Sequence, residues 1–506
     1  MNTRKKFHLS RWQKVALLTI TILTIAILIV RLAGSYWLKR YVPQLETAIT
    51  SSTGLVAKIR GKSGISFYPA LGIRLGDVEL KQENGPKIGA RELVVGLKLL
   101  ALLDKEIAIS NIVIYQPDIQ WPLGAGLPIP PARIVDSSTG SKDKPGYQLS
   151  SLGLIRVHQG KLVVTSPIGE PVYAIEGGDL EIHPLGSSAP LAKSVEELKL
   201  AMYLSFEKAR IRKVELGPSR IKGRFQNGKL IVSITQSQVL DGAGIAGLVW
   251  QKNAQGQHLI EGSFSLIGFD SRKSAAWFGR KAFVSGKLDL GATFTVNTDN
   301  LKDIKKSISG NLHLSGKDID LISINLDELL RKIIESQNYD LVDATAFFFV
   351  GPLGTAATKG YDFSNIAVEA TKSKTAANKI LKMVSIWDVS NGIATTRDVA
   401  LETAKYRLAM NGRINVIKNE FDDLRVAIID NKGCAIAKQR LNGPINNPSI
   451  DKLNILLTLT QPVLDVLGKS AKQLLSAATE CTPFYTGSLL PESKKNSKTE
   501  SDSSTE

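Results

Sequence analysis

Cysteine and histidine are scarce in this chain, which has two cysteines and five histidines among 506 residues. Two thiols exclude a disulfide-dense scaffold and a four-thiolate zinc site. None of the histidines lies at metal-ligand spacing from another histidine or from a cysteine; they are His8, His158, His183, His258 and His313. The scarcity therefore argues against a bound metal.

Complete catalytic motifs are also lacking. Gly61-Lys62-Ser63 resembles the end of a phosphate loop, but no glycine stands five residues before Gly61. Ser205 and Lys208 match S-x-x-K, a pattern so short that chance matches are expected in a chain of this length. The sequence predicts a protein that is not an enzyme and has no cofactor.

Basic runs and clustered aromatic residues are missing as well, although the net charge is +17. Nucleic-acid surfaces concentrate their positive charge and interleave it with aromatic residues. Here the aromatic fraction is 6% and no run of five basic residues occurs. We therefore expect no nucleic-acid partner.

Residues 12–34 form the one long apolar run, and they predict a transmembrane helix. The segment from Val15 to Val30 contains no charge, and about 20 residues can cross a hydrocarbon core of ~30 Å. Interfacial aromatic residues flank the run, and the predicted anchor residues are Trp12, Val15, Leu17, Ile20, Leu23, Ile27, Val30 and Trp37. The alternative is a cleaved signal peptide, for which Leu32-Ala33-Gly34-Ser35 is a poor cleavage site.

The charge around this run predicts its orientation. Five basic residues and no acidic residue precede it, namely Arg4, Lys5, Lys6, Arg11 and Lys14. Positive residues stay on the cytoplasmic side of a membrane. The N-terminus is therefore predicted to be cytoplasmic and the bulk of the chain to lie across the membrane.

Beyond the anchor, the sequence predicts a mainly β protein with a few helices. A short helix over 45–53 should stop at Gly54. Short apolar runs over 58–121 predict strands, residues 122–150 are rich in Pro, Gly and Ser, and period-2 alternation dominates 151–450. Apolar spacing predicts helices over 324–337, 374–387 and 462–480, and the polar tail 491–506 is predicted to be disordered.

The alternation predicts a long antiparallel meander with one apolar face. In the segment 287–296 this face carries Leu288, Leu290, Ala292, Phe294 and Val296, and in 229–235 it carries Leu230, Val232 and Ile234. Asn227-Gly228 and Asn411-Gly412 are predicted as hairpin turns. The pattern alone does not distinguish a face packed in a sandwich core from a face left open as a trough.

The two cysteines, Cys434 and Cys481, would both lie in an oxidising space if the predicted topology holds. Such a pair is expected to close into a disulfide. The alternative is a pair of buried free thiols.

Several segments resemble the AsmA family. Thr53-Gly54 is followed by Phe67, Pro69, Leu71-Gly72-Ile73, Leu75, Asp77-Val78 and Leu80, and then by Leu102, Leu103 and Lys105 to Ile107. Residues 316–321, 387–416 and 443–450 are similar to the C-terminal region of that family. The order of these segments behind a membrane anchor carries the resemblance, whereas residues 150–310 match only in texture.

The resemblance implies a protein of the Gram-negative inner membrane whose bulk faces the periplasm, related to bridge-like lipid-transfer proteins. It implies a chorein-like start that is followed by a U-shaped β-groove in which lipid acyl chains lie. Candidate lining residues are Leu230, Val232, Ile234, Leu288, Leu290, Phe294 and Val296.

The implied organisation has seven parts along the chain. These are a cytoplasmic N-terminus (1–11), the anchor (12–34), a chorein-like region (35–121), a linker (122–150), the β-groove (151–450), a C-terminal amphipathic helix and cap (451–490) and the tail (491–506).

Two functional hypotheses remain at this point. In the first, the protein handles membrane phospholipid without chemistry and contributes to outer-membrane biogenesis. In the second, it is a structural or assembly factor that binds outer-membrane or envelope assembly proteins.

Overall fold

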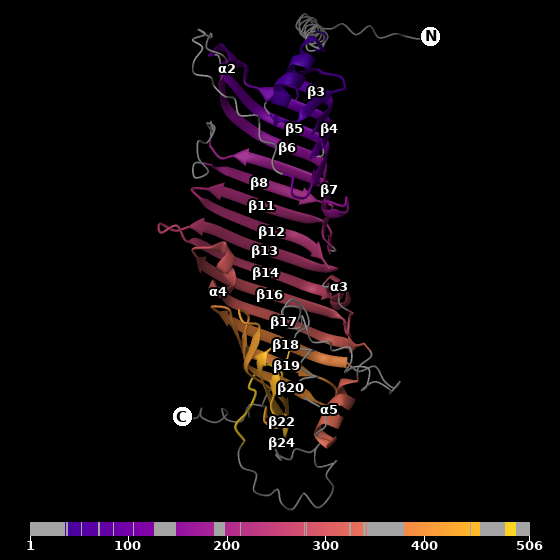
Figure 1. Cartoon of the computed structure of the whole chain (residues 1–506), viewed down its shortest axis with the longest axis vertical. Helices are drawn as coiled ribbons and strands as arrows, with labels where there is room; N and C mark the ends of the chain where they lie inside the picture. The colour runs from indigo at the N-terminus through magenta and orange to yellow at the C-terminus, as the bar shows by residue number, and fades with distance from the viewer. Residues whose placement is uncertain are drawn as a thin grey trace, which may run out of the picture. The chain divides into compact units, whose positions relative to one another are not determined.

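The structure is a computed structural model that describes residues 36–125, 148–186, 198–336, 341, 379–455 and 481–491, apart from a few single positions and pairs inside these ranges. The chain divides into two compact units, unit 1 (Met1–Ser237) and unit 2 (Gln238–Glu506). Each unit is a curved layer of strands lying side by side (Figure 1).

The N-terminal helix of unit 1 is helical over residues 39–51 and at Thr53, and it ends before Gly54. Gly54 adopts φ +73°, and its backbone N–H donates to the carbonyl of Thr50 at 2.9 Å. This left-handed glycine satisfies a carbonyl at the helix end. The predicted stop at Gly54 is confirmed, and the helix begins earlier than expected.

Unit 1 contains twelve labelled strands and one short helix. They are β1 (Val56–Ile59), β2 (Gly64–Ser66), β3 (Gly72–Lys81), β4 (Lys87–Leu97), α2 (Leu99–Leu103), β5 (Glu106–Pro122), β6 (Gln148–Thr165), β7 (Pro171–Pro184), β8 (Leu200–Phe206), β9 (Lys208–Ile211), β10 (Val214–Leu216), β11 (Ser219–Gln226) and β12 (Lys229–Val239). Strands β1 and β2 both pair with β3, and the order then runs β3-β4-β5-β6-β7. Strands β8 and β9 both pair with β7, and β11 lies between β8 and β12.

One pair departs from the predicted antiparallel meander, because β5 and β6 are parallel. Parallel neighbours need a crossover of a dozen or more residues, since the chain must return to the same end of the sheet. The Pro-, Gly- and Ser-rich stretch after Pro122 supplies that length before β6 begins at Gln148.

The strands of unit 2 are antiparallel. Its first strands are longer, and its last strands are covered on both faces. Its elements are β13 (Gly242–Lys252), β14 (His258–Asp270), α3 (Ser271–Trp277), β15 (Val284–Ser285), β16 (Lys287–Thr298), η1 (Leu301–Asp303), α4 (Ile304–Ser307), β17 (Ile308–Leu321), α5 (Leu326–Ser336), β18 (Lys379–Ser390), β19 (Ile393–Glu402), β20 (Arg407–Asn415), β21 (Glu420–Ile429), β22 (Ala435–Pro444), β23 (Ser449–Ile450) and β24 (Asn454–Ile455). The sheet order is β13-β14-β16-β17-β18-β19-β20-β21-β22, with β23 and β24 both on β22.

The helix predicted over 324–337 is confirmed as α5, whereas the helix predicted over 374–387 is wrong. That segment contributes strand β18, which begins at Lys379. Both faces of β18 are covered: Met383 and Trp387 are buried on one face and Val384 on the other. A strand buried on both faces loses its alternation, and its continuous apolar run can be mistaken for a helix.

One predicted hairpin turn is confirmed and the other is wrong. Asn227 and Gly228 adopt φ +52° and +69° between β11 and β12, as a two-residue hairpin of type I′ requires. Gly412 instead lies inside β20 at φ +135°, where it interrupts the pairing with β21. Asn-Gly marks positive φ in both places, but only tertiary pairing decides between a turn and an irregular strand.

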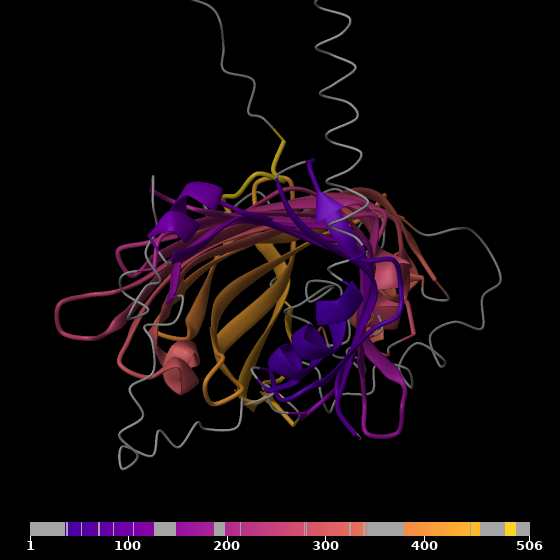
Figure 2. The same ribbon diagram turned by 90° about the horizontal axis from the view of Figure 1, so that it is seen from above.

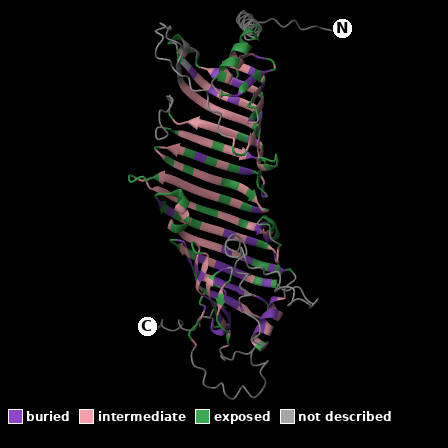
Figure 3. Cartoon of the chain, viewed as in Figure 1, coloured by how far each residue is buried: buried purple, intermediate pink, exposed green. Residues whose placement is uncertain are grey.

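Buried side chains are distributed unevenly over the two units. A large hydrophobic cluster of unit 2 includes the apolar side of α5 and one face of β16–β22. The cluster of unit 1 is small and consists of Ile59, Leu75 and Val78, with Val42 and Leu45 of the N-terminal helix packed against it. In Figure 3 the buried class accordingly gathers on the last strands of unit 2, while the intermediate class follows the strands of unit 1.

Three predicted segments lie outside the described residues: the span at 12–34, the helix at 462–480 and most of the tail at 491–506. Among the helices that the structure does describe, none has the length and apolar character needed to cross a membrane.

Candidate functional site

Strand register places the apolar side chains of unit 1 on one face, called here the unit 1 apolar face. One row across the sheet runs through Leu75, Leu93, Ile114, Val157, Leu180, Leu204, Ile221 and Ile234. A second row runs through Ile73, Val95, Ile112, Ile155, Ile182, Met202, Gly223 and Val232. Directly opposed residues share a face of the sheet. The face is therefore apolar from β3 to β12.

Within the described part of unit 1, this face is covered only at its start. The N-terminal helix packs there, where Leu75 is 4% exposed (Figure 2). The side chains of Ile114, Val157, Leu180 and Leu204 are only partly buried. No other helix or strand in the described part of unit 1 covers them, so they form no closed core of their own.

The opposite face of unit 1 is largely polar, apart from Val94 and Val113, which are buried at 0% and 1% exposure. The row next to Leu180 and Leu204 contains Arg156, Glu181 and Tyr203. Arg156 Nε donates to Glu181 Oε1 at 2.7 Å, and His183 Nε2 lies 3.0 Å from Glu181 Oε2. The hydrogen bond with His183, followed by Arg156, lowers the pKa of Glu181. The two faces therefore differ in character, as in sheets with one apolar and one solvated face.

Irregular residues bend the unit 1 strands at one level. Asp77, Gln116 and Gln159 adopt φ of +45°, +47° and +51° on β3, β5 and β6. The side chains of Arg91, Gln116 and Gln159 form a ladder at this level: Arg91 Nη1 donates to Gln116 Oε1, and Gln116 Nε2 donates to Gln159 Oε1, both at 3.1 Å. Such irregularities kink a strand and increase its twist. Figure 2 shows the unit 1 strands curving around the N-terminal helix.

Unit 2 begins with an apolar face that is also partly open. The rows here pair Phe264 with Ala292 and Gly262 with Phe294. A Cβ atom on Gly262 would lie 2.2 Å from Cζ of Phe294, so the ring of Phe294 lies over this glycine. Phe264 is 36% exposed. These aromatic side chains offer a second apolar surface, on β14 and β16.

The same face becomes a packed core further along unit 2. Helix α5 buries Leu326, Leu330 and Ile333 completely, each at 0% exposure. Asn325 caps the helix by accepting from the backbone N–H of Glu328 at 3.0 Å. A hydrogen bond from Arg331 lowers the pKa of Glu328. Helix α5 thus covers the apolar face of unit 2. In the described part of unit 1, the N-terminal helix gives similar cover only at the start of the face.

Residues 481–491, the C-terminal strap, cover the other face of β18–β22. Tyr485 and Leu489 pack with Val384, Ala400 and Ala427. The N–H of Phe484 donates to the carbonyl of Gly433 at 2.8 Å. Both faces of these strands are therefore shielded from solvent.

The strap is held by a polar clamp and a disulfide. The hydroxyl of Tyr485 donates to Asp398 Oδ1, and Asp398 Oδ2 accepts from the N–H of Ser488 at 3.1 Å. Burial, followed by the hydrogen bond to Asp398, raises the pKa of Tyr485. Cys434 and Cys481 form the predicted disulfide, with their Cα atoms 6.1 Å apart.

The candidate lining residues fall into two groups. Leu230, Val232, Ile234 and Phe294 remain partly exposed on the apolar faces. Leu288, Leu290 and Val296 are buried at 0%, 6% and 3% exposure, and the first two belong to the unit 2 core. The predicted anchor residues, Trp12 to Val30 and Trp37, lie outside the described residues.

Sequence reasoning missed the kink residues Gln116 and Gln159 and the strap clamp between Tyr485 and Asp398. The kinks coincide with places where polar residues interrupt an apolar alternation, which is a weak signal. The clamp joins residues 87 positions apart and leaves no local pattern. Within the described part of the chain, no group of three or more His, Cys, Asp or Glu is placed to hold a metal ion.

Comparison with family models finds a match at the start of the chain. The model of the AsmA family matches residues 9–124, which include the predicted span, the N-terminal helix and strands β1 to β5. The resemblance read from the sequence is confirmed over this stretch. No curated protein matches the chain.

Proposed function

We propose that this chain is a membrane-anchored, non-enzymatic lipid-handling protein that holds the acyl chains of phospholipid against the apolar faces of its sheet. The similarity to the AsmA family over residues 9–124 supports a role in the bacterial envelope. In this proposal the anchor lies in the Gram-negative inner membrane and the two units lie in the periplasm. The work of the protein is to shield lipid from water on its way toward the outer membrane.

The observation that carries the proposal is the uncovered unit 1 apolar face. Its rows are apolar on strand after strand, yet side chains such as Ile114 and Leu204 stay partly exposed in the described structure. Exposed apolar area on this scale is unusual for a soluble domain unless a ligand or partner covers it. Each methylene of an acyl chain buried there would contribute about 0.8 kcal/mol.

The opposite face supports the same use of the sheet. Its ion pairs, such as Arg74 with Glu92 at 3.4 Å and Arg156 with Glu181 at 2.7 Å, are partly solvated. Exposed ion pairs add little stability, roughly 0–1 kcal/mol each, but they keep a surface in water. One face can then hold lipid while the other remains hydrated.

The disulfide supports a location outside the cytoplasm. Cys434–Cys481 is of the structural kind that forms and persists in oxidising compartments such as the periplasm. The positive charges before residue 12 favour the same topology.

Lipid carried by the purified full-length chain tests the proposal, with native mass spectrometry as the measurement. The double variant Leu204→Gln/Ile221→Gln places two amides on the apolar face, at directly paired positions of β8 and β11. Its matched control, Tyr203→Gln/Lys222→Gln, changes the paired neighbours on the opposite face of the same strands.

We expect bound phospholipid in the wild type, a several-fold loss in the first variant and no change in the control. Circular dichroism would verify that both variants fold. Absence of lipid from the wild type, or equal loss in both variants, would contradict the proposal. A stoichiometric protein partner in place of lipid would favour the assembly hypothesis.

A further inference from the structure

One end of unit 1 carries a group of large apolar side chains that are almost fully exposed. Helix α2 presents Leu100 and Leu103, which are 80% and 81% exposed. The loop before β3 presents Phe67 and Tyr68, which are 41% and 82% exposed. Leucine at this exposure on two positions of a five-residue helix indicates that something covers it.

Backbone hydrogen bonds place these segments beside each other. The N–H of Leu97 donates to the carbonyl of Leu71 at 2.9 Å, where β4 ends and the loop before β3 passes. The N–H of Lys98 donates to the carbonyl of Ala108 at 2.8 Å, where β5 begins. Helix α2 and the Phe67–Tyr68 loop therefore share one end of the sheet, called here the α2 end (Figure 1).

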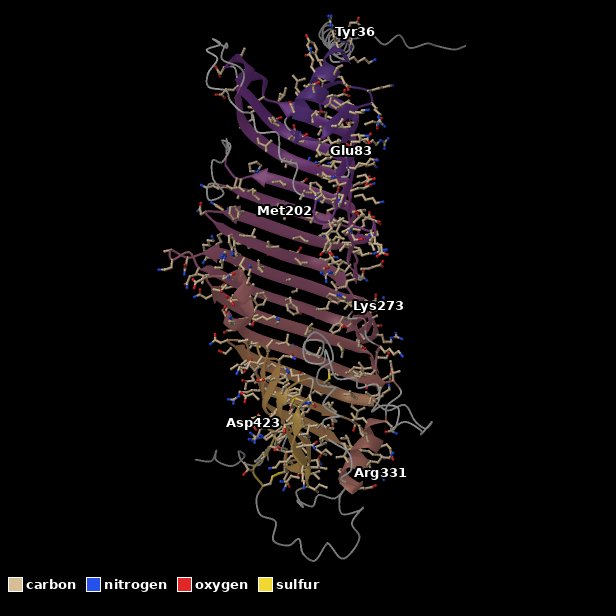
Figure 4. The ribbon with its side chains drawn as sticks, viewed as in Figure 1. Tyr36, Glu83, Met202, Lys273, Arg331 and Asp423 are labelled. Atoms are coloured by element: carbon tan, nitrogen blue, oxygen red, sulfur yellow. A yellow bond between two sulfur atoms is a disulfide. The ribbon has the colours of Figure 1, made fainter. Side chains whose placement is uncertain are left out.

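The N-terminal helix also starts at the α2 end. Thr50 Oγ1 accepts from the N–H of Ala57 at 3.0 Å, and Glu46 Oε1 accepts from the N–H of Ile59 at 2.7 Å. Ala57 and Ile59 pair with Leu80 and Val78, so going backward along the helix leads toward the start of β3. Figure 4 shows Tyr36 at the top of the chain, where Figure 1 in the same view places α2, and Glu83 lower down.

The chain therefore arrives from the predicted span at the same end where the exposed leucines lie. The span over 12–34 ends just before Tyr36, which is itself 80% exposed. A bilayer crossed by that span would lie within reach of α2 and of the Phe67–Tyr68 loop. The crossover before β6 also returns to this end, because Gln148 pairs with Glu106 of β5; the test below distinguishes cover by that segment from contact with a bilayer.

We propose that the α2 end is a membrane-docking surface, in which Leu100, Leu103, Phe67 and Tyr68 insert into the interfacial layer of the anchoring phospholipid bilayer. Leucine inserts among acyl chains, and Phe and Tyr are suited to the boundary with the headgroups. The docking gives unit 1 a second attachment beside the span. It rests on the predicted anchor and does not depend on acyl-chain binding by the apolar face.

The α2 end carries exposed side chains of both charge signs, and this determines how it can attach to a membrane. Lys39, Arg40 and Lys98 are exposed there, and so are Asp104 and Glu106. Anionic lipid attracts clusters of basic residues, each by roughly 1 kcal/mol, and such attraction is screened by salt. The opposing carboxylates offset that attraction here. Docking should therefore rest on apolar insertion and change little with ionic strength.

A fluorescent depth measurement tests the docking. The full-length chain is reconstituted in phosphatidylcholine vesicles, with the dye NBD on a cysteine introduced by Leu100→Cys, Tyr68→Cys or, as a control, Glu83→Cys. The native cysteines are joined as Cys434–Cys481 and do not compete for the label. Quenching is measured with phospholipids carrying a spin label near the headgroup.

We expect strong quenching and a blue-shifted emission at positions 100 and 68, little quenching at 83, and the same result in high salt. In the Leu103→Glu background, quenching at position 68 should fall several-fold, while the matched change Leu123→Glu, at the far end of β5, should leave it unchanged.

Equal quenching at 100 and 83 would overturn the proposal. So would a blue-shifted label at 100 that lipid does not quench, because a segment of this chain, such as 123–147, or a second copy would then cover α2. Retained lipid in native mass spectra would show that such a failure concerns docking alone.

Discussion

The apolar face of unit 1 and the strands β18–β22 of unit 2 both carry rows of apolar side chains but differ in how far these side chains are buried. Leu204 in β8 is only partly buried, whereas Leu408 in β20 is completely buried. The difference lies in the cover. Helix α5 packs on one face of β18–β22 and the C-terminal strap on the other, while the described structure of unit 1 provides only the N-terminal helix at its start.

This contrast separates stability from function. A sheet covered on both faces gains hydrophobic free energy and a single packed arrangement. A sheet with one uncovered apolar face forgoes part of that gain and keeps a surface for an apolar ligand. Unit 2 thus contributes a packed core, whereas unit 1 contributes an apolar surface that is only partly covered.

The largest expected effect compares two leucines truncated in the same way. Leu330→Ala, in α5, should lower the free energy of unfolding by about 2–5 kcal/mol, because Leu330 is fully buried and its removal leaves a cavity. Leu204→Ala should cost about 1 kcal/mol or less, because a partly exposed side chain leaves no enclosed cavity. Urea unfolding followed by hydrogen exchange in each unit measures both changes, and equal losses would mean that the unit 1 face is packed like the core.

The disulfide is expected to stabilise unit 2 alone. Cys434→Ser/Cys481→Ser removes a link across 47 residues, which should cost about 2–4 kcal/mol and release the strap. Hydrogen exchange should accelerate at residues 481–491 and remain unchanged in β3 to β8. Faster exchange in those unit 1 strands would show that the two units do not differ in the way described.

Two glycines with positive φ test how closely the strap is docked. Gly433 and Gly228 adopt φ of +81° and +69°. A Cβ on Gly433 would lie 2.0 Å from the carbonyl oxygen of Tyr485, whereas a Cβ on Gly228 would meet no atom within 4 Å. Gly228→Ala should cost about 1 kcal/mol for its backbone conformation alone. Gly433→Ala should cost more and expose the strap to protease; similar behaviour of the two variants would argue against close docking of the strap.

The smallest effect concerns the clamp and its pH dependence. Tyr485→Phe removes the hydrogen bond to Asp398 and should weaken strap docking by about 1–2 kcal/mol at neutral pH. Burial and this hydrogen bond raise the pKa of Tyr485 above its ordinary value of 10.0, so the folded state favours the neutral phenol. Its contribution is complete below pH 10 and is lost as the pH rises above 10. The wild type should therefore approach the Phe variant in alkaline solution, as measured by strap exchange, and a constant difference would contradict the clamp.

Local patterns were enough to predict those strands of both units that have one face exposed to solvent. Alternation at Leu230 and Phe294 and the stop at Gly54 rest on short-range rules, and the structure agrees with them. The disulfide was predicted instead from the expected compartment of the only two cysteines, and the structure contains it. Strand β18 was mistaken for a helix because cover on both faces removes the alternation.

Other features depend on contacts that no local pattern contains. The parallel pairing of β5 with β6 is set by where a long crossover returns. The ladder of Gln116 and Gln159 arises from alignment of kinks on neighbouring strands. Whether an apolar face is covered, as at Leu290, or open, as at Ile234, is decided by elements elsewhere in the chain.

Site-specific photo-crosslinking tests the central claim most directly. A benzophenone amino acid replaces Ile234 on the apolar face of β12 or its neighbour Ser233 on the opposite face, in full-length protein within membranes that contain labelled phospholipid. The account predicts lipid adducts at position 234 and none above background at 233. Equal labelling at both positions, or labelling at neither, would contradict the claim that the unit 1 apolar face holds lipid.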